Sequence, residues 1–306
     1  MKKSDIRKGT IRIMGFSLAV FVIIHLIYVY CPVTEEPDNA VADASGRVAW
    51  SDTLANSMSE IAELKPMDAE IERFIRKWEI KGISLAVTRH DSLLYAKGYG
   101  LADHLSDEPM DASSIMRMAS ASKLVTAVGI MRLCEDGKLG LDTKVFGDGG
   151  ILNDTSYTNA MRDPRMLDIT IDHLLQHKGG FTLGAGDPMF NTKEIMAVKH
   201  LSSPPSNEEL TKIVLGRRLG FTPGNGRRYS NFGYMLLSLV IERVTGKSYW
   251  DYVKEEVLDP AGAYQFRPAT NYYADRHARE TRYYPPDNEL VEEYNGSGKM
   301  VERVYG

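Results

Sequence analysis

The chain has 306 residues, of which 43% are hydrophobic and 25% charged, and its formal net charge is -4. This composition is typical of a globular protein and excludes a disordered or collagen-like chain. The near balance of charges gives no electrostatic basis for a nucleic-acid partner. Two cysteines, Cys31 and Cys134, are too few for a disulfide scaffold, and no metal-ligand motif is present. We therefore expect neither a metal nor a cofactor.

The N-terminal segment, residues 1–31, has the pattern of a membrane anchor. Residues 13–30 are apolar except for Ser17 and His25, which is close to the ~20 residues that a membrane-spanning helix needs. Basic residues precede this run and acidic residues follow it, so we expect an extracytoplasmic domain, periplasmic or at the cell surface. A cleaved signal peptide is the alternative. Residues 32–65 are rich in Pro, Asp, Ala, Ser and Glu and are expected to form a linker.

The folded part is expected to begin with a helix and a hairpin. Residues 68–79 place apolar side chains at helical spacing, and Asp68 is suited to cap that helix. Residues 83–88 alternate between apolar and small or polar side chains, which predicts a strand, and residues 92–99 predict its partner after a turn at 90–91.

The rest of the chain is expected to be mainly helical, ending in a tyrosine-rich tail. Residues 120–135 predict a helix with apolar surface on more than one side, which is typical of a helix buried within a domain. A short helix is expected near 171–177, followed by irregular structure over 182–228. A longer helix is expected from about 231 to 244, ended by Gly246, and a short helix capped by Ser248 follows it. The tail could form strands near 279–284, 290–294 and 299–305.

Ser120 and Lys123 form a Ser-x-x-Lys motif at the start of the predicted helix 120–135. Helical spacing puts both side chains on one face. A serine hydroxyl needs a base before it can act as a nucleophile, and a desolvated lysine can supply one. The alternative is that Ser120 only caps the helix and Lys123 is a surface lysine.

Tyr229 and Asn231 form a second candidate pair. In an extended segment their i, i+2 spacing points both side chains the same way, and a turn-rich stretch precedes them while an apolar helix follows. A phenol can relay a proton, and a carboxamide can hold a substrate amide. The alternative is a structural tyrosine and a helix N-cap at Asn231.

His173 and His177 have the i, i+4 spacing of a metal pair. No acidic third ligand accompanies them, so we favour a structural loop over a metal site. Cys134 lies late in the helix 120–135 and is expected to be a small core residue.

With both motifs placed, the chain resembles the serine β-lactamase and penicillin-binding-protein-like family, in the branch of class C β-lactamases, D-alanyl-D-alanine carboxypeptidases and esterases. The resemblance covers about residues 66–265, and its motifs occur in the family's order: the opening hairpin at 82–88 and 97–100, the nucleophile helix and its exit at 117–123 and 133–142, a His-Thr-Ser-Gly-like loop at 172–180, and the segments 221–224, 229–231 and 244–248.

The resemblance implies a fold and a set of roles. The fold would be α/β of the α+β type, β-lactamase/transpeptidase-like, with an antiparallel sheet flanked by helices and a mostly helical lobe at about 140–230. Ser120 would be the acylated nucleophile and Lys123 its base or proton partner. Tyr229 would help move the proton, and Asn231 would orient the substrate amide. The implied activity is that of a serine hydrolase acting on amide, lactam or ester substrates, small molecules or peptides.

The sequence departs from the family at its third motif. Residues 232–306 contain neither Lys-Thr-Gly nor His-x-Gly, so we expect the domain at 66–306 to be C-terminally incomplete. Two alternatives to an active hydrolase therefore stay open: a catalytically silent, membrane-tethered binding or regulatory module on the same fold, and an inactive fragment.

Overall fold

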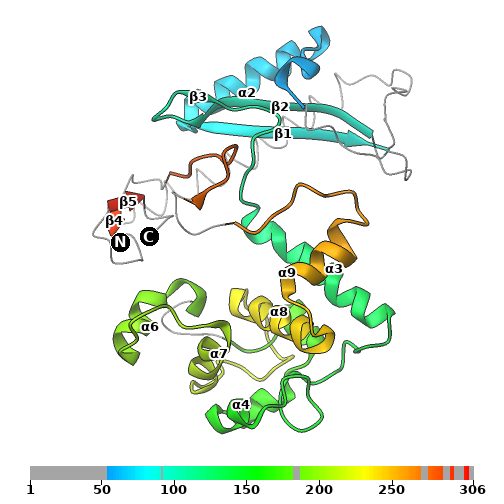
Figure 1. Ribbon diagram of the computed structural model, residues 1–306, viewed down its shortest axis with the longest axis vertical. Helices are drawn as coiled ribbons and strands as arrows, with labels where there is room; N and C mark the ends of the chain where they lie inside the picture. Colours follow the sequence, from blue (N-terminus) through cyan, green and yellow to red (C-terminus); the bar gives the residue numbers. More distant parts are fainter. Residues whose placement is uncertain are drawn as a thin grey trace. The chain divides into compact units, whose positions relative to one another are not determined.

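The structure is a computed structural model that describes residues 54–90, 92–181, 187–269, 275–284, 290–292 and 300–302. The chain divides into two compact units (Figure 1). Unit 1 comprises residues up to Arg117 together with those from Ala269 onward, and unit 2 comprises Met118–Pro268. Unit 2 is a longer range than the helical lobe expected at 140–230. The predicted membrane anchor at 1–31 lies outside the described residues.

Unit 1 contains an antiparallel sheet in the order β1-β2-β3, made of β1 (Gly82–Arg89), β2 (Ser92–Asp103) and β3 (Glu108–Pro109). Gly82 pairs with Gly100 and Arg89 with Ser92, with a register shift between Val87 and Thr88. The predicted hairpin is thus confirmed. β2 is longer than expected because its last residues also pair with β3, which lies nearby in the sequence.

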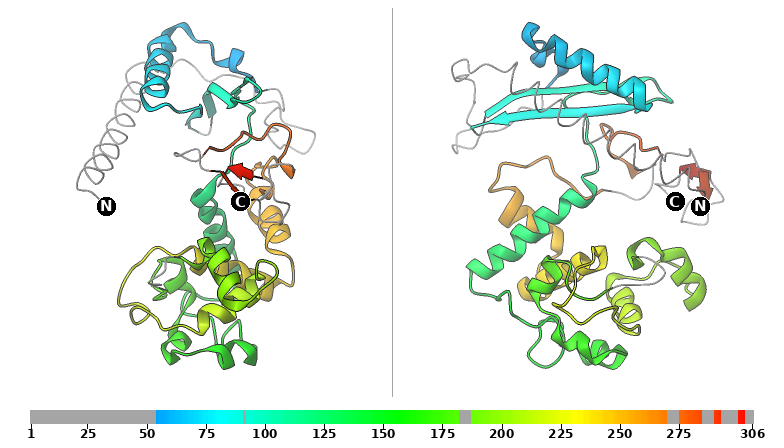
Figure 2. Two further views of the ribbon diagram at one scale, coloured as in Figure 1. Left: turned by 90° about the vertical axis from the view of Figure 1, so that its left-hand side faces the viewer. Right: turned by 180° about the vertical axis from the view of Figure 1, so that it is seen from behind.

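Helix α2 (Lys65–Trp78) lies across one face of this sheet (Figure 2). Its residues Met67 and Ile71 are buried against Tyr95 and Tyr99 of β2, together with Leu64. The prediction that Asp68 caps the helix is wrong, because the helix begins three residues earlier. The Asp68 carboxylate instead accepts hydrogen bonds from the hydroxyls of Tyr95 and Tyr99, both at 2.6 Å, and pairs with Lys97 at 3.0 Å. This polar network fastens α2 to the sheet.

The last part of the expected linker belongs to the fold of unit 1. Two short 3-10 helices, η1 (Asn56–Ser59) and η2 (Ala62–Leu64), precede α2. The Asn56 side chain bonds the backbone of Gly98, and the buried Ser59 hydroxyl bonds both backbone groups of Ala96. These side chains satisfy backbone groups of β2 that β1 does not reach.

In the described part of the C-terminal tail, two of the three segments expected to be strands contain one, and the segment 279–284 does not. The described backbone there contains β4 (Leu290–Glu292) paired antiparallel with β5 (Met300–Glu302). Residues 279–284 are not a strand: Glu280 makes only an isolated bridge with Ile115. Charged groups hold this segment instead, since Arg117 pairs with Glu280, and Arg276 with the buried Asp103.

The regular structure of unit 2 consists of helices joined by turns and loops, within its described residues. Its α-helices are α3 (Ser122–Glu135), α4 (Thr155–Ala160), α5 (Ile171–Leu175), α6 (Thr192–Lys199), α7 (Asn207–Leu215), α8 (Asn231–Thr245) and α9 (Tyr249–Val253). The 3-10 turns η3 (Ala119–Ala121), η4 (Pro164–Asp168) and η5 (Pro188–Phe190) connect some of them, and a π-helical turn, η6 (Lys254–Leu258), continues α9.

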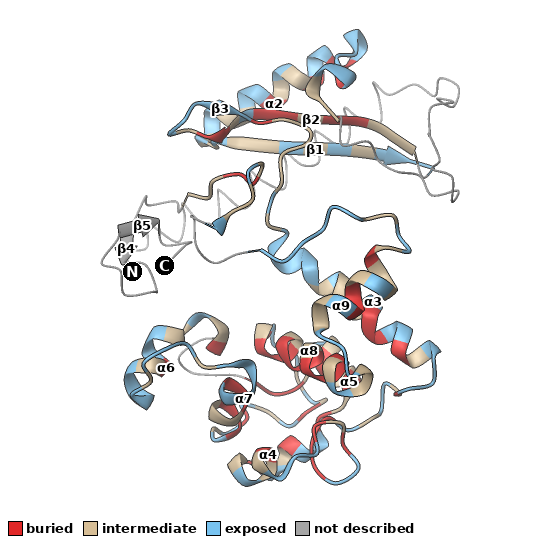
Figure 3. Ribbon diagram, in the orientation of Figure 1, coloured by how far each residue is buried: buried red, intermediate tan, exposed pale blue. Residues whose placement is uncertain are grey.

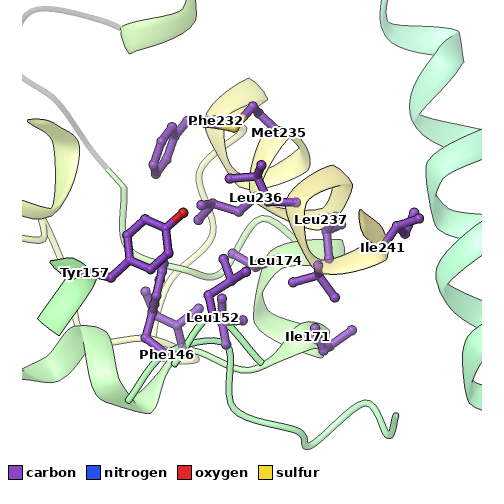
Figure 4. Close-up of a cluster of buried hydrophobic side chains, with 14 of the residues drawn as sticks. Phe146, Leu152, Tyr157, Ile171, Leu174, Phe232, Met235, Leu236, Leu237 and Ile241 are labelled. Atoms are coloured by element: carbon purple, nitrogen blue, oxygen red, sulfur yellow. The ribbon is translucent and has the colours of Figure 1, made fainter. Parts of the chain in front are cut away.

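The core of unit 2 is built around α8. Phe232, Leu236, Leu237 and Ile241 of this helix are fully buried, and they pack with side chains of α5 and of the loop that contains Phe146 (Figure 4). The Ser230 hydroxyl caps the helix by accepting the N–H of Gly233, and Gly246 ends it with a φ of 68°, as predicted.

Two expectations for unit 2 are wrong. Residues 182–228 are not irregular throughout, because α6 and α7 lie there; Ser206 and Glu209 form a capping box at the start of α7. Helix α3 is also not buried on several sides. It buries Thr126, Gly129, Ile130 and Leu133, while Leu124, Val128 and Met131 lie on an exposed face (Figure 3).

Among the described residues, none of the helices combines the length and apolar character required to cross a membrane.

Candidate active site

Ser120 lies in the 3-10 turn η3 that leads into α3, and its side chain is exposed to solvent. The preceding residue, Ala119, has a φ of 46°, a left-handed conformation that costs a non-glycine residue about 1 kcal/mol. The turn is held by Ala121 N–H, which bonds the Met118 carbonyl, and by the Ser122 hydroxyl, which bonds the Ala119 carbonyl. The chain therefore presents the Ser120 hydroxyl outward on a tight, strained turn.

Lys123 lies in the first turn of α3, on the same side as Ser120, as the i, i+3 spacing predicts. Its Nζ donates to Ser120 Oγ at 3.2 Å and to Asn231 Oδ1 at 2.6 Å. The same ammonium lies 4.9 Å from the ring centroid of Tyr229 and 5.6 Å from that of Tyr234. Two hydrogen bonds and two aromatic faces thus fix the position of this cation.

Tyr229 and Asn231 come from the segment that enters α8. Ser230 between them is extended, with φ -141° and ψ 118°, and Ser230, not Asn231, is the helix N-cap. The Tyr229 hydroxyl donates to Ser120 Oγ at 2.7 Å. The structure therefore brings all four predicted side chains together within unit 2, across more than a hundred positions of sequence.

The charges and hydrogen bonds of the site shift the pKa of Tyr229. Burial raises the pKa of this phenol, but the Lys123 ammonium and the hydrogen bond with Ser120 lower it more, so that its pKa lies below the ordinary value of 10.0. The lowered pKa makes the phenolate form of Tyr229 easier to reach, next to the hydroxyl whose proton must be removed. Tyr229 keeps 52% of its surface exposed, so solvent screens part of this effect.

Two residues at the site were not predicted to belong to it. Asp187 accepts the backbone N–H of Asn231 at 2.6 Å through Oδ2. His177 accepts the backbone N–H of Ser230 at 3.2 Å through Nδ1. No local pattern marks Asp187, whereas His177 belongs to the His-Thr-Ser-Gly-like loop, for which the sequence favours a structural role.

The two histidines considered for a metal pair each bind a backbone amide. His173 Nδ1 accepts the N–H of Thr170 in the cap of α5, and His177 Nδ1 accepts the N–H of Ser230. Within the ranges that the structure describes, no group of three His, Cys, Asp or Glu side chains could hold a metal ion.

Comparisons with known proteins agree on one family. The family model described as Beta-lactamase matches residues 67–301. The chain is 30% identical over 220 residues to esterase EstB of Burkholderia gladioli, covering 69% of this chain and 53% of that protein. It is 31% identical over 207 residues to a penicillin-binding protein of Bacillus subtilis (strain 168), covering 66% of this chain and 41% of that protein. The chain thus spans about half the length of the curated relatives it matches.

Solved structures show the same fold. The octameric penicillin-binding protein homologue from Pyrococcus abyssi matches with a TM-score of 0.56 and 23% identity, covering 79% of this chain and 51% of that chain. A class C beta-lactamase in complex with cefoxitin matches with a TM-score of 0.55 and 23% identity, covering 73% of this chain and 56% of that chain. At this identity the likeness concerns the fold alone.

Proposed function

The chain belongs to the beta-lactamase family of serine hydrolases, and from this premise we propose that it forms an acyl-enzyme on Ser120 with ester, lactam or amide substrates. The observation that supports the proposal most is the convergence on one exposed hydroxyl: Tyr229 OH lies 2.7 Å and Lys123 Nζ 3.2 Å from Ser120 Oγ. Both distances are within the reach that proton transfer needs.

The first step is attack of Ser120 Oγ on the substrate carbonyl carbon. The serine proton passes to Tyr229 in its phenolate form, which the Lys123 charge favours. The tetrahedral intermediate then breaks the bond to the amine or alcohol, which leaves with that proton, and the acyl group stays on Ser120 as an ester. In the second step water attacks this ester, Tyr229 accepts its proton, and the acid is released as Ser120 Oγ regains a proton.

Asn231 and the backbone at Ser120 complete the proposed machinery. The Oδ1 atom of Asn231 holds Lys123, which leaves the Nδ2 group as the donor for a substrate carbonyl. By resemblance to the family, the backbone N–H of Ser120 is one oxyanion donor. Such a donor lowers the barrier by roughly 2.7–4 kcal/mol in known cases.

The substrate class stays open among three chemistries because their first step is the same. The names of the relatives fit all three: an esterase, penicillin-binding proteins and a beta-lactamase. No feature of the described site separates an alcohol from an amine leaving group. We therefore propose a small-molecule or peptide substrate with an ester, lactam or amide carbonyl.

We further propose that the domain works outside the cytoplasm, held by residues 13–30. The support is the sequence pattern alone: an apolar run with basic residues before it and acidic residues after it. Alkaline extraction of membranes tests it, with protease added to intact and to permeabilised cells. Release of the full-length chain by alkali would contradict the anchor, and a shortened mature chain would favour the cleaved signal peptide.

The experiment for the proposed function measures turnover of a p-nitrophenyl ester, a chromogenic cephalosporin and a D-alanyl-D-alanine peptide by the full chain. We expect at least one to be hydrolysed. Ser120→Ala should abolish this hydrolysis, while Ser203→Ala, a control at an exposed serine elsewhere in unit 2, should retain it. No turnover of any substrate, combined with reversible ligand binding, would instead support a silent binding module.

A further inference from the structure

Two successive backbone amides at the entrance to α8 are bound by side chains from elsewhere in the sequence. Ser230 N–H donates to His177 Nδ1 at 3.2 Å, and Asn231 N–H donates to Asp187 Oδ2 at 2.6 Å. In extended backbone such as that of Ser230, successive N–H groups point to opposite sides. The segment that carries Tyr229 and Asn231 is thus held from two sides. We refer to His177 and Asp187 as the amide clasp.

Asp187 connects this segment to a second one. Its other carboxylate oxygen accepts the N–H of Met189 at 3.0 Å, which starts the turn η5. Its negative charge lies at the N-terminus of α8, where the helix dipole favours an anion. Both oxygens are thereby fixed, so Asp187 offers Asn231 a rigid acceptor.

His177 is fixed by packing and by its backbone. Its ring centroid lies 4.5 Å from that of Tyr229 and 5.1 Å from that of Tyr234, and the Tyr234 hydroxyl is itself anchored on the Leu175 carbonyl. The residue has a φ of 60°, and its own carbonyl accepts the N–H of Arg228. Because Nδ1 accepts a hydrogen bond, the ring proton must be on Nε2.

Both members of the amide clasp bind the backbone of the segment that carries Tyr229 and Asn231. Ser230 turns its own buried side chain to the cap of α8, so its neighbours on either side, Tyr229 and Asn231, face Ser120 and Lys123. We propose that His177 and Asp187 are positioning residues that hold the Tyr229 phenol and the Asn231 carboxamide in register with Ser120 and Lys123. This inference rests on the proposed acylation of Ser120.

The amide clasp also contributes to the electrostatic environment of the Tyr229 phenol. The Asp187 carboxylate raises the pKa of Tyr229 and thereby opposes the Lys123 charge. Burial lowers the pKa of His177, and the charges of Arg227 and Lys123 lower it further, against the Ser230 hydrogen bond and Asp187. The ring is therefore neutral at neutral pH, which its role as an acceptor requires.

Variants at Asp187 separate position from charge. Asp187→Asn keeps one oxygen that can accept the Asn231 N–H, but it removes the charge and the acceptor for the Met189 N–H, whereas Asp187→Ala removes both acceptors and the charge. The matched control is Asp154, which caps α4 in the same unit by accepting the N–H of Ser156 at 2.7 Å. Asp154→Asn and Asp154→Ala change the same chemistry away from the site.

Variants at His177 separate the acceptor from the backbone conformation. Asn and Gly both tolerate a φ of 60° better than most residues. Asn places Oδ1 where the histidine has Nδ1, because both atoms are bonded to Cγ. His177→Asn therefore keeps the acceptor, His177→Gly loses it, and both lose the ring packing.

The readouts are the rate of Ser120 acylation by a fluorophosphonate against pH, and the titration of the Tyr229 Cζ signal by NMR, identified with Tyr229→Phe. We expect Asp187→Ala and His177→Gly to slow acylation by about 10–100-fold, as small misplacements of reacting groups do. We expect His177→Asn to recover most of the loss. Asp187→Asn should lose less acylation rate than Asp187→Ala, and both the Tyr229 titration and the limb of the pH–rate profile that follows it should move to lower pH.

Several results would overturn the amide clasp: acylation by Asp187→Ala or His177→Gly at the wild-type rate, equal losses in the Asp187 and Asp154 variants, or a Tyr229 titration that does not move in Asp187→Asn. The NMR titration needs no turnover. If the wild-type chain is not acylated, the proposed function fails, and the Tyr229 titration still decides whether Asp187 acts on this phenol.

Discussion

Polar side chains are used differently in the two units. In unit 1, Asp68 receives the hydroxyls of Tyr95 and Tyr99 and pairs with Lys97, and these groups are largely shielded from solvent. In unit 2, Ser120 and Tyr229 make equally short contacts, yet both are exposed. The first network joins a helix to a sheet, whereas the second surrounds a hydroxyl that a substrate can reach.

The difference shows what separates a structural polar network from a reactive one. Burial raises the pKa values of Tyr95 and Tyr99 above the ordinary tyrosine value, and the Asp68 charge adds to this effect, so both phenols stay protonated. Burial also raises the pKa of Tyr229, but Lys123 and the hydrogen bond with Ser120 together lower it more. An anion beside a phenol therefore makes it a fixed donor, and a cation beside it prepares it to accept a proton.

The largest effect is expected from removing that cation. Lys123→Met keeps much of the side-chain volume but removes the charge, so acylation should fall by about 10²–10⁴-fold, the range of general acid–base contributions. The Tyr229 pKa should rise towards 10.0. The limb of the pH–rate profile that reports the ionisation of Tyr229 should therefore move to higher pH. Lys144→Met, which removes an exposed lysine paired with Asp168, is the control. Equal rates in the two variants would contradict the role of Lys123.

The next effect concerns the core that supports the site. Leu237 in α8 is fully buried, so Leu237→Ala should lower the free energy of unfolding by about 2–5 kcal/mol. Leu124 in α3 keeps 69% of its surface exposed, and Leu124→Ala should change the free energy of unfolding by less than about 0.5 kcal/mol. Denaturant unfolding measures both. A large loss from Leu124→Ala would show that the exposed face of α3 is covered in solution.

A smaller effect is expected in unit 1. Asp68→Asn leaves the hydroxyls of Tyr95 and Tyr99 with a weaker acceptor, at a cost of about 1–3 kcal/mol, and should not change the acylation of Ser120 in the folded protein. Burial raises the pKa of Asp68, but the hydrogen bonds and Lys97 lower it more. The stabilisation is therefore complete above the unfolded value of 3.8 and is lost as the pH falls through the folded value.

The pH dependence of unfolding checks this prediction. Between about pH 5 and pH 2 the wild-type chain should lose more stability than Asp68→Asn, because only the wild type has this carboxylate to protonate. Parallel curves for the two proteins would show that Asp68 does not contribute through its charge.

The sequence predicts the parts of the fold whose signals are local. Alternation from residue 83 predicts the hairpin, and Gly246 predicts the end of α8. Local signals failed for Asp68, where a capping residue type instead binds tyrosines about 30 positions away. They also failed for the exposed face of α3, because apolar composition does not say which sides of a helix find partners.

For the site, the order of the motifs along the chain and the family resemblance selected Ser120, Lys123, Tyr229 and Asn231, and the fold brings them together. The amide clasp could not be predicted in this way. His177 and Asp187 bind backbone N–H groups 53 and 44 positions away, and a backbone amide has no signature in the sequence. Such contacts depend on tertiary structure alone.

The most direct test of the account is a time course of intact-protein mass after the full chain is mixed with a slowly hydrolysed ester or lactam. We predict that the protein gains the mass of the acyl group and later loses it, and that peptide mapping locates the adduct on Ser120. No mass gain, or an adduct on another residue that persists in Ser120→Ala, would contradict the account.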